Sequence, residues 1–251
     1  MSYGMYLSAE GALAQGKRLE VISNNLANVN TVGFKPDTAS FQARFSEAIQ
    51  QRGANEGDRS INDISGGVSV METLTSYAPG TQQRTGNTTD MMVVGAGFFT
   101  VEGQNGETLL TRAGNFRLDN QGQLVTQDNR PVLDSAGAPI QINLEEPWEL
   151  SRSGEIVQNG ARTPLGIVEP DSFDGLTKVG ANRFSTSGPI NEVELVDREV
   201  RQGHLEMSGA NPTTQMLSMI ETTRAFEANT RMIQNQDSMT ESLVSRLLTV
   251  A

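Results

Sequence analysis

Cysteine is absent from this chain of 251 residues, and histidine occurs once, as His204. Without thiols there is no disulfide framework, no thiolate metal site and no cysteine nucleophile. His204 has no acidic motif beside it, so we expect neither an imidazole metal site nor a bound cofactor. The longest apolar run, residues 91–99, contains two glycines and is about half the length that spans a bilayer. Membrane insertion is therefore not expected.

Basic residues are also few. Nineteen Lys and Arg face 30 Asp and Glu, which leaves a net charge of −11 and disfavours binding to nucleic acid or to an anionic membrane. The excess acid lies in residues 51–205, whereas the two ends are nearly neutral. This distribution suggests that the ends face protein and the middle faces water. No Sec signal is expected, because the first basic residue is Lys17 and Glu10 interrupts the apolar stretch.

Glycine and proline are missing from the last 39 residues, which follow Asn211-Pro212, an N-cap residue and a favoured first helical residue. The segment from Thr213 to Ala251 predicts a helix about 55–60 Å long, which must protrude or pair with another helix. Steps of three and four residues give an apolar seam with polar interruptions: Met216, Met219, Thr223, Phe226, Thr230, Ile233, Asp237, Thr240, Val244 and Leu247. A second face adds Ile220, Met232, Met239, Leu243 and Leu248, which implies more than one neighbour.

The N-terminal segment predicts a second helix with a seam of smaller side chains, which allow a close approach of another backbone. The seam is formed by Met5, Ala9, Ala12, Gly16, Leu19, Ser23 and Leu26. The helix is expected to end within residues 28–33, where Asn and Gly favour a C-terminal cap. Ordinary capping accounts for Asn28 but not for Asn24 and Asn25. We predict that these three asparagines set register between helices, as polar seam residues do.

The middle of the chain predicts strands instead. Residues 51–66 are polar and lack periodicity, which indicates a hinge loop. Short β-type segments separated by turn clusters follow: 68–74, 91–102, 108–118, 123–133, 139–144 and 184–200. We therefore expect an α+β chain. Its terminal helices (residues 1–50 and 206–251) form a coiled-coil-like stalk and assembly domain, and residues 67–205 form a β-rich outer domain.

Enzyme signatures are weak. Gly95-Ala96-Gly97 lacks the third glycine of a dinucleotide fingerprint and is better explained as a bulge or turn. Glu145-Glu146 indicates solvated charge. A carbohydrate-binding or adhesin domain would need exposed aromatics, yet the one tryptophan, Trp148, is expected to pack over a loop. That class, and a glycosidase-like enzyme with two carboxylates, remain alternatives, although we expect the protein not to be an enzyme.

One segment matches a family motif more specifically than it matches any enzyme signature. The stretch Ser23-Asn-Asn-Leu-Ala-Asn-Val-Asn-Thr-Val-Gly-Phe-Lys35 resembles the N-terminal motif of bacterial flagellar basal-body rod and hook proteins. Three further stretches agree in order: residues 90–99 with their Gly-x-Gly-Phe-Phe ending, residues 111–116 leading into 122–125, and residues 219–229. Residues 144–200 carry no motif of this kind. The length favours a rod protein over the longer hook subunit.

The resemblance implies a structural subunit of the rod, which crosses the periplasm and transmits torque from motor to hook. It implies self-assembly, contact with other rod and hook axial proteins, and delivery by the flagellar type III export apparatus. The terminal helices would form the inner tube, with the β domain outside. The predicted subunit interface combines both seams with the motif: Met5, Ala9, Ala12, Gly16, Leu19, Asn24, Asn25, Leu26, Asn28, Gly33, Phe34, Met216, Ile220, Phe226, Ile233, Met239, Leu243 and Leu247.

Overall fold

The computed structural model describes residues 3–43, 68–196 and 198–249, so the predicted hinge loop at 51–66 lies outside the described residues. The chain divides into two compact units. The helical unit takes residues 1–27, 37–76 and 211–251, and the β unit takes residues 28–36 and 77–210. With helices at both ends and strands between them, the α+β class is confirmed.

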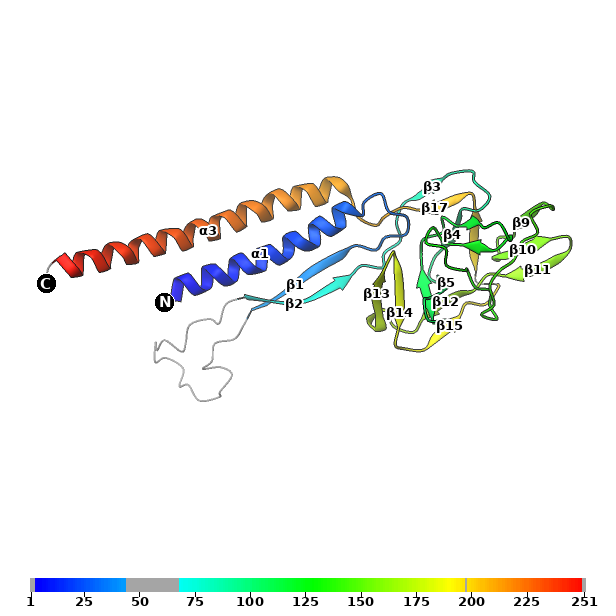
Figure 1. Cartoon of the computed structure of the whole chain (residues 1–251), viewed down its shortest axis with the longest axis horizontal. Helices are drawn as coiled ribbons and strands as arrows, with labels where there is room; N and C mark the ends of the chain where they lie inside the picture. Colours follow the sequence, from blue (N-terminus) through cyan, green and yellow to red (C-terminus); the bar gives the residue numbers. More distant parts are fainter. Residues whose placement is uncertain (1–2, 44–67, 197, 250–251) are drawn as a thin grey trace. The chain divides into compact units, whose positions relative to one another are not determined.

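Two long helices dominate the helical unit. Helix α1 spans Tyr3–Ala27 and helix α3 spans Pro212–Thr249, and Figure 1 shows them running antiparallel, side by side. The predicted start of the second helix is confirmed, because Asn211 Oδ1 accepts hydrogen bonds from the backbone N–H groups of Thr213 and Thr214 at 3.0 and 3.2 Å. This is the geometry of an N-cap.

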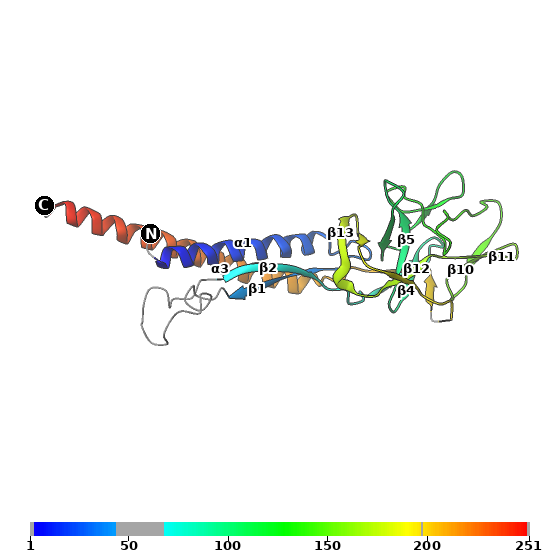
Figure 2. The same cartoon turned by 90° about the horizontal axis from the view of Figure 1, so that it is seen from below.

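A two-stranded sheet completes the helical unit. Strand β1 (Asp37–Ala43) pairs antiparallel with β2 (Val68–Thr75), and the register shifts between Ser40 and Phe41. Both strands contact α1 (Figures 1 and 2). Strand β1 belongs to the helical unit, within the residues 1–50 assigned to the terminal domain, but no strand was predicted there. Its sequence has a single large apolar residue, Phe41, so it carries no alternation that would have marked a strand.

The β unit contains a six-stranded antiparallel sheet in the order β13-β14-β6-β5-β12-β15, a three-stranded sheet β11-β10-β9, and the pairs β16-β4, β17-β3 and β7-β8. The strand bounds are β3 Gln82–Arg84, β4 Met91–Val94, β5 Phe98–Glu102, β6 Thr108–Thr111, β7 Arg117–Leu118, β8 Leu124–Val125, β9 Trp148–Leu150, β10 Glu155–Gln158, β11 Ala161–Pro164, β12 Ile167–Pro170, β13 Leu176–Gly180, β14 Arg183–Thr186, β15 Ile190–Glu192, β16 Glu199–Gln202 and β17 His204–Glu206.

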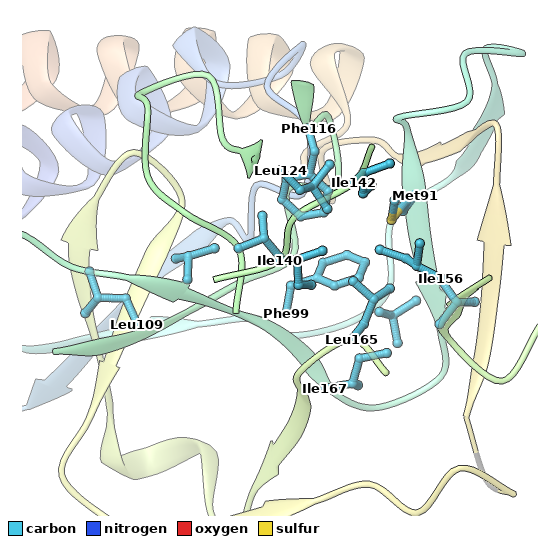
Figure 3. Packing of buried hydrophobic residues seen from close by; sticks show 14 residues of the cluster. Met91, Phe99, Leu109, Phe116, Leu124, Ile140, Ile142, Ile156, Leu165 and Ile167 are labelled. Carbon is cyan, nitrogen blue, oxygen red and sulfur yellow. The ribbon is translucent and has the colours of Figure 1, made fainter. Parts of the chain in front are cut away.

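Both faces of the central strands are buried. Successive residues of a strand point to opposite faces, and in β5 Phe98 and Phe99 are 1% and 0% exposed. Phe99 joins the larger cluster, whose members are drawn in Figure 3. Phe98 joins a smaller cluster with Leu110 and Phe184. A core on each side of the sheet explains why β5 begins with two consecutive large apolar residues.

The unit boundaries differ from those expected from the sequence. Residues 28–36 and 206–210 belong to the β unit, whereas residues 67–76 belong to the helical unit. The physical reason is backbone pairing. The Gly33 N–H donates to the Glu206 carbonyl at 2.7 Å, and the Gly209 N–H donates to the Phe34 carbonyl at 2.9 Å. β2 instead pairs with β1.

Candidate assembly surfaces and a buried charge cluster

The contact between α1 and α3 is made by small and polar residues. A Cβ added to Gly11 would lie 3.2 Å from the side-chain amide of Asn229, and one added to Gly4 would lie 2.8 Å from Gln236 Nε2. On α3, Thr222 is 2% exposed. The two helices therefore approach closely, but their contact buries few large apolar side chains.

Most of the large apolar side chains of α3 are exposed instead. Their exposed fractions run from 37% at Phe226 to 65% at Met239. We call this set the apolar stripe: Met216, Leu217, Ile220, Phe226, Met232, Met239, Leu243 and Val244. An exposed apolar surface of this kind is typical of an interaction site. The stripe includes five predicted interface residues (Met216, Ile220, Phe226, Met239 and Leu243). A sixth, Ile233, is half-buried, and the side chain of Leu247 lies outside the described residues.

The predicted seam of α1 is out of step with the face that packs on α3. The close contacts fall at Gly4 and Gly11, whereas the seam begins at Met5 and steps through residues 9, 12 and 16. Ala12 is buried, and the predicted residues Met5, Ala9, Gly16, Leu19 and Leu26 are half-buried. A Cβ on Gly16 would lie 3.9 Å from the Phe226 ring, an ordinary contact. The seam therefore flanks the α1–α3 contact and stays a predicted surface for a second copy.

Asn25 has a role within the single chain. Its side-chain amide donates to the Asp37 carbonyl at 2.7 Å and accepts from the Asp37 N–H at 3.0 Å, and the side chain is 2% exposed. It thereby closes the base of the loop formed by residues 28–36. Asn24 is exposed, and Asn28 accepts from the N–H and hydroxyl of Thr31 at 3.1 and 3.2 Å. A role of these asparagines in subunit register stays a prediction.

The end of the motif is buried in the β unit. Phe34 is 6% exposed, and Lys178 Nζ lies 4.9 Å from the centre of its ring. Lys178 also donates to the Lys35 carbonyl at 2.7 Å. Gly33 and Phe34 were predicted to lie at a subunit interface, but in the described chain both are held by contacts with their own β unit.

Next to them lies a buried charge cluster, defined as Lys35, Arg112 and Glu206. The Lys35 ammonium donates to Glu206 Oε1 at 2.7 Å and to the Ala78 carbonyl at 2.9 Å. The Arg112 guanidinium donates to Glu206 Oε2 at 3.3 Å and to the Gly95 carbonyl at 2.7 Å. The side chains of Lys35 and Glu206 are 1% and 2% exposed.

One carboxylate thus balances two buried cations. Burial lowers the pKa of Lys35 below its usual value of 10.5, and the contact with Glu206 opposes that shift. Burial lowers the pKa of Arg112 in the same way, again against the attraction of Glu206. Removal of Glu206 would take away the carboxylate that both cations contact, and with it the ion pair of each buried cation, in a medium where bare charge is costly.

Gly33 is required by the same packing. Its φ is +68°, and an added Cβ would lie 2.4 Å from the Arg112 carbonyl carbon. We expect Gly33→Ala to lower the free energy of unfolding by well over 1 kcal/mol, measured by denaturant titration. Gly86→Ala is the matched control, because φ there is +77° and nothing lies within 4 Å of the added Cβ. Equal losses in the two variants would show that backbone strain alone, and not the close contact, determines the effect.

The other sequence candidates have structural contacts. His204 Nδ1 lies 2.9 Å from the Gln202 carbonyl. Residues 95–97 form the turn between β4 and β5, with positive φ at Gly95 and Gly97, as predicted. Trp148 corrects its prediction, because it lies on β9 and packs against the larger core cluster. Among the described residues no group of three His, Cys, Asp or Glu side chains could hold a metal.

A helix suited to crossing a membrane is likewise absent from the described part of the chain.

The charge cluster was not found from the sequence. Lys35 ends the first motif and Arg112 lies in the third, but Glu206 is 171 positions from Lys35 in the chain. Nothing in spacing or periodicity pairs residues so far apart. The one available signal was that Lys35 and Arg112 are each the single charged residue of an otherwise uncharged motif.

Three family models match the chain. The flagella basal body rod protein model matches residues 5–35, the flagellar hook protein FlgE/F/G D1 domain matches residues 92–162, and the flagellar basal body rod FlgEFG protein C-terminal model matches residues 201–247. The matches therefore cover α1 with its motif, the centre of the β unit, and most of α3.

Similar curated proteins cover nearly the whole chain. The flagellar basal-body rod protein FlgG of Bacillus subtilis is 32% identical, over 98% of this chain and 99% of its own length. FlgF of Rhizobium meliloti is 32% identical over 98% of each chain. FlgF of Caulobacter vibrioides is 28% identical, also over 98% of each.

Proposed function

The chain belongs to the flagellar basal-body rod proteins and is a structural subunit of the rod in the basal body, and on that premise we propose that it polymerises through its helical unit. In this proposal α1 and α3 form a coiled-coil-like pair that lines the inside of the rod. The β unit lies outside and stiffens the shaft that carries torque to the hook.

The single observation that carries the proposal is the placement of apolar side chains on α3. The closest approaches of α1 to α3 fall at the polar side chains of Asn229 and Gln236, whereas every residue of the apolar stripe is at least 37% exposed. In the monomer these side chains stay exposed and contribute little burial energy. Burying each one is worth about 1.5–3 kcal/mol. A polymer in which neighbouring copies cover the stripe gains that energy at every subunit.

Rod proteins assemble with other rod and hook proteins, and we infer that this subunit contacts such axial neighbours through the same surface. We also propose that it reaches the rod through the flagellar type III export apparatus. A chain without cysteine suits that route, because no disulfide can form while it travels unfolded. The family is a structural one, and the comparisons give no support to an adhesin or a glycosidase.

Deletion of residues 213–251 tests the proposal. The truncated chain loses the apolar stripe, so it should form no rods by electron microscopy and restore no motility to cells that lack the native subunit. The cores of the β unit lie within residues 91–200, so its thermal unfolding should persist as an internal control. Polymerisation of the truncated chain would contradict the proposal.

A further inference from the structure

A groove opens in the helical unit where α1 ends and α3 begins. α1 contributes Arg18, Val21 and Ile22, β1 contributes Phe41, and the first turns of α3 contribute Gln215 and Ser218. Its volume is about 270 Å³, roughly that of nine liquid waters, so it can accept whole side chains. Its apolar lining comes from Ile22, which is 6% exposed, and from Val21 and Phe41, which are half-buried, beside polar residues of the same elements.

At the other end of the helical unit, α3 continues past its partner. Gln236 lies opposite Gly4, near the first described residue of α1, and α3 continues to Thr249. We call residues 237–249 the overhang; Figure 1 shows it extending beyond the label N. Met239 and Leu243 lie one turn apart on one face of the overhang and are 65% and 61% exposed. α1 has no described residue that could cover them.

The overhang cannot fill the groove of its own chain. Ser218 and Leu243 belong to one continuous helix and are about 38 Å apart at 1.5 Å per residue. Other copies of the chain can cover both surfaces, because each copy has one groove and one overhang. Such a head-to-tail contact is heterologous, and where the rotation does not close it builds an open helical polymer.

From this juxtaposition we propose that the overhang of one copy docks into the α1–β1–α3 groove of the next, with Met239 and Leu243 against Val21, Ile22 and Phe41. The inference rests on the proposed function, since it specifies one contact within polymerisation through the helical unit. It also explains why the exposed apolar residues of α3 extend beyond the α1 pair. The contact joins subunits along the direction of the helices.

Cysteine cross-linking tests the contact on the full chain, which has no native cysteine. Thr38 is exposed at the edge of the groove. A chain carrying Thr38→Cys, mixed with one carrying Leu243→Cys and assembled under mild oxidation, should give a disulfide-linked dimer. The double variant should give a ladder of oligomers. The matched control replaces Thr38→Cys with Leu13→Cys, which lies on α1, is 73% exposed and does not line the groove, and it should give no such product.

Alanine substitutions test the same contact if a cysteine variant assembles poorly. Leu243→Ala and Phe41→Ala should each raise the concentration needed for assembly by about tenfold, and the double variant should be no worse than the worse single one, because both remove the same contact. Normal polymers with no cross-link beyond the control, or additive effects of the two alanines, would overturn the groove contact alone. If the full chain fails to polymerise, or the chain without residues 213–251 still polymerises, the proposed function itself fails.

Discussion

Glu206→Gln is expected to lower the free energy of unfolding of the β unit by about 3–5 kcal/mol, the range for breaking a buried ion pair. The amide can still accept hydrogen bonds from Lys35 and from the Gly80 N–H, which Glu206 Oε1 accepts at 2.7 and 2.8 Å. It has no charge, however, so Lys35 and Arg112 would remain buried without the carboxylate that pairs with both. Urea titration followed by near-UV circular dichroism measures the change.

The control is the same substitution at an exposed ion pair in the same unit. Glu199 accepts from Arg201 at 2.7 Å, and the two side chains are 48% and 43% exposed. Exposed pairs contribute about 0–1 kcal/mol, so Glu199→Gln should leave the unfolding midpoint almost unchanged. If Glu206→Gln is as mild as Glu199→Gln, the buried cluster does not hold residues 33–35 in the β unit.

Ile220→Asp is expected to abolish rod assembly while the folded monomer keeps its stability. In the monomer Ile220 is 52% exposed, and surface substitutions of this kind usually change the free energy of unfolding by less than about 0.5 kcal/mol. In a polymer that covers the apolar stripe, each copy would lose the burial of an isoleucine and would bury an unpaired carboxylate, which is far more costly. Sedimentation and electron microscopy measure assembly, and thermal unfolding measures the monomer.

Asn235→Asp adds the same charge at an exposed polar position of α3 and should assemble at near normal concentration. Loss of assembly in both variants would point to a general sensitivity of α3 to negative charge. Normal assembly of Ile220→Asp would remove the stripe from the subunit interface.

The long helices were predictable because their signals are local. The Asn211 cap and the absence of Gly and Pro define the start and the length of α3. Apolar residues spaced alternately three and four positions apart predict which side chains need a partner. The sequence also placed Met216 on one apolar face and Ile220 and Met239 on a second, and all three side chains are exposed in the structure.

The features that the sequence did not predict depend on contacts between residues that are far apart in the chain. β1 has too few apolar residues to be recognised and becomes a strand only because β2 lies beside it. Residues 33–35 look like the end of the N-terminal segment, yet they belong to the β unit because Glu206 and Arg112 meet them there. Gly4 and Gly11, which meet α3, lie outside the predicted α1 seam, since periodicity alone cannot say which partner a given face meets.

The most direct test of the account is the accessibility of α3 before and after assembly. Ile220→Cys gives the chain a single thiol, and we predict fast maleimide labelling of the monomer and strong protection in the assembled rod. Val196→Cys, at a side chain that is 91% exposed in the β unit, provides the reference for labelling in both states. Labelling of the cysteine at position 220 at the same rate in monomer and rod would contradict assembly through the apolar stripe.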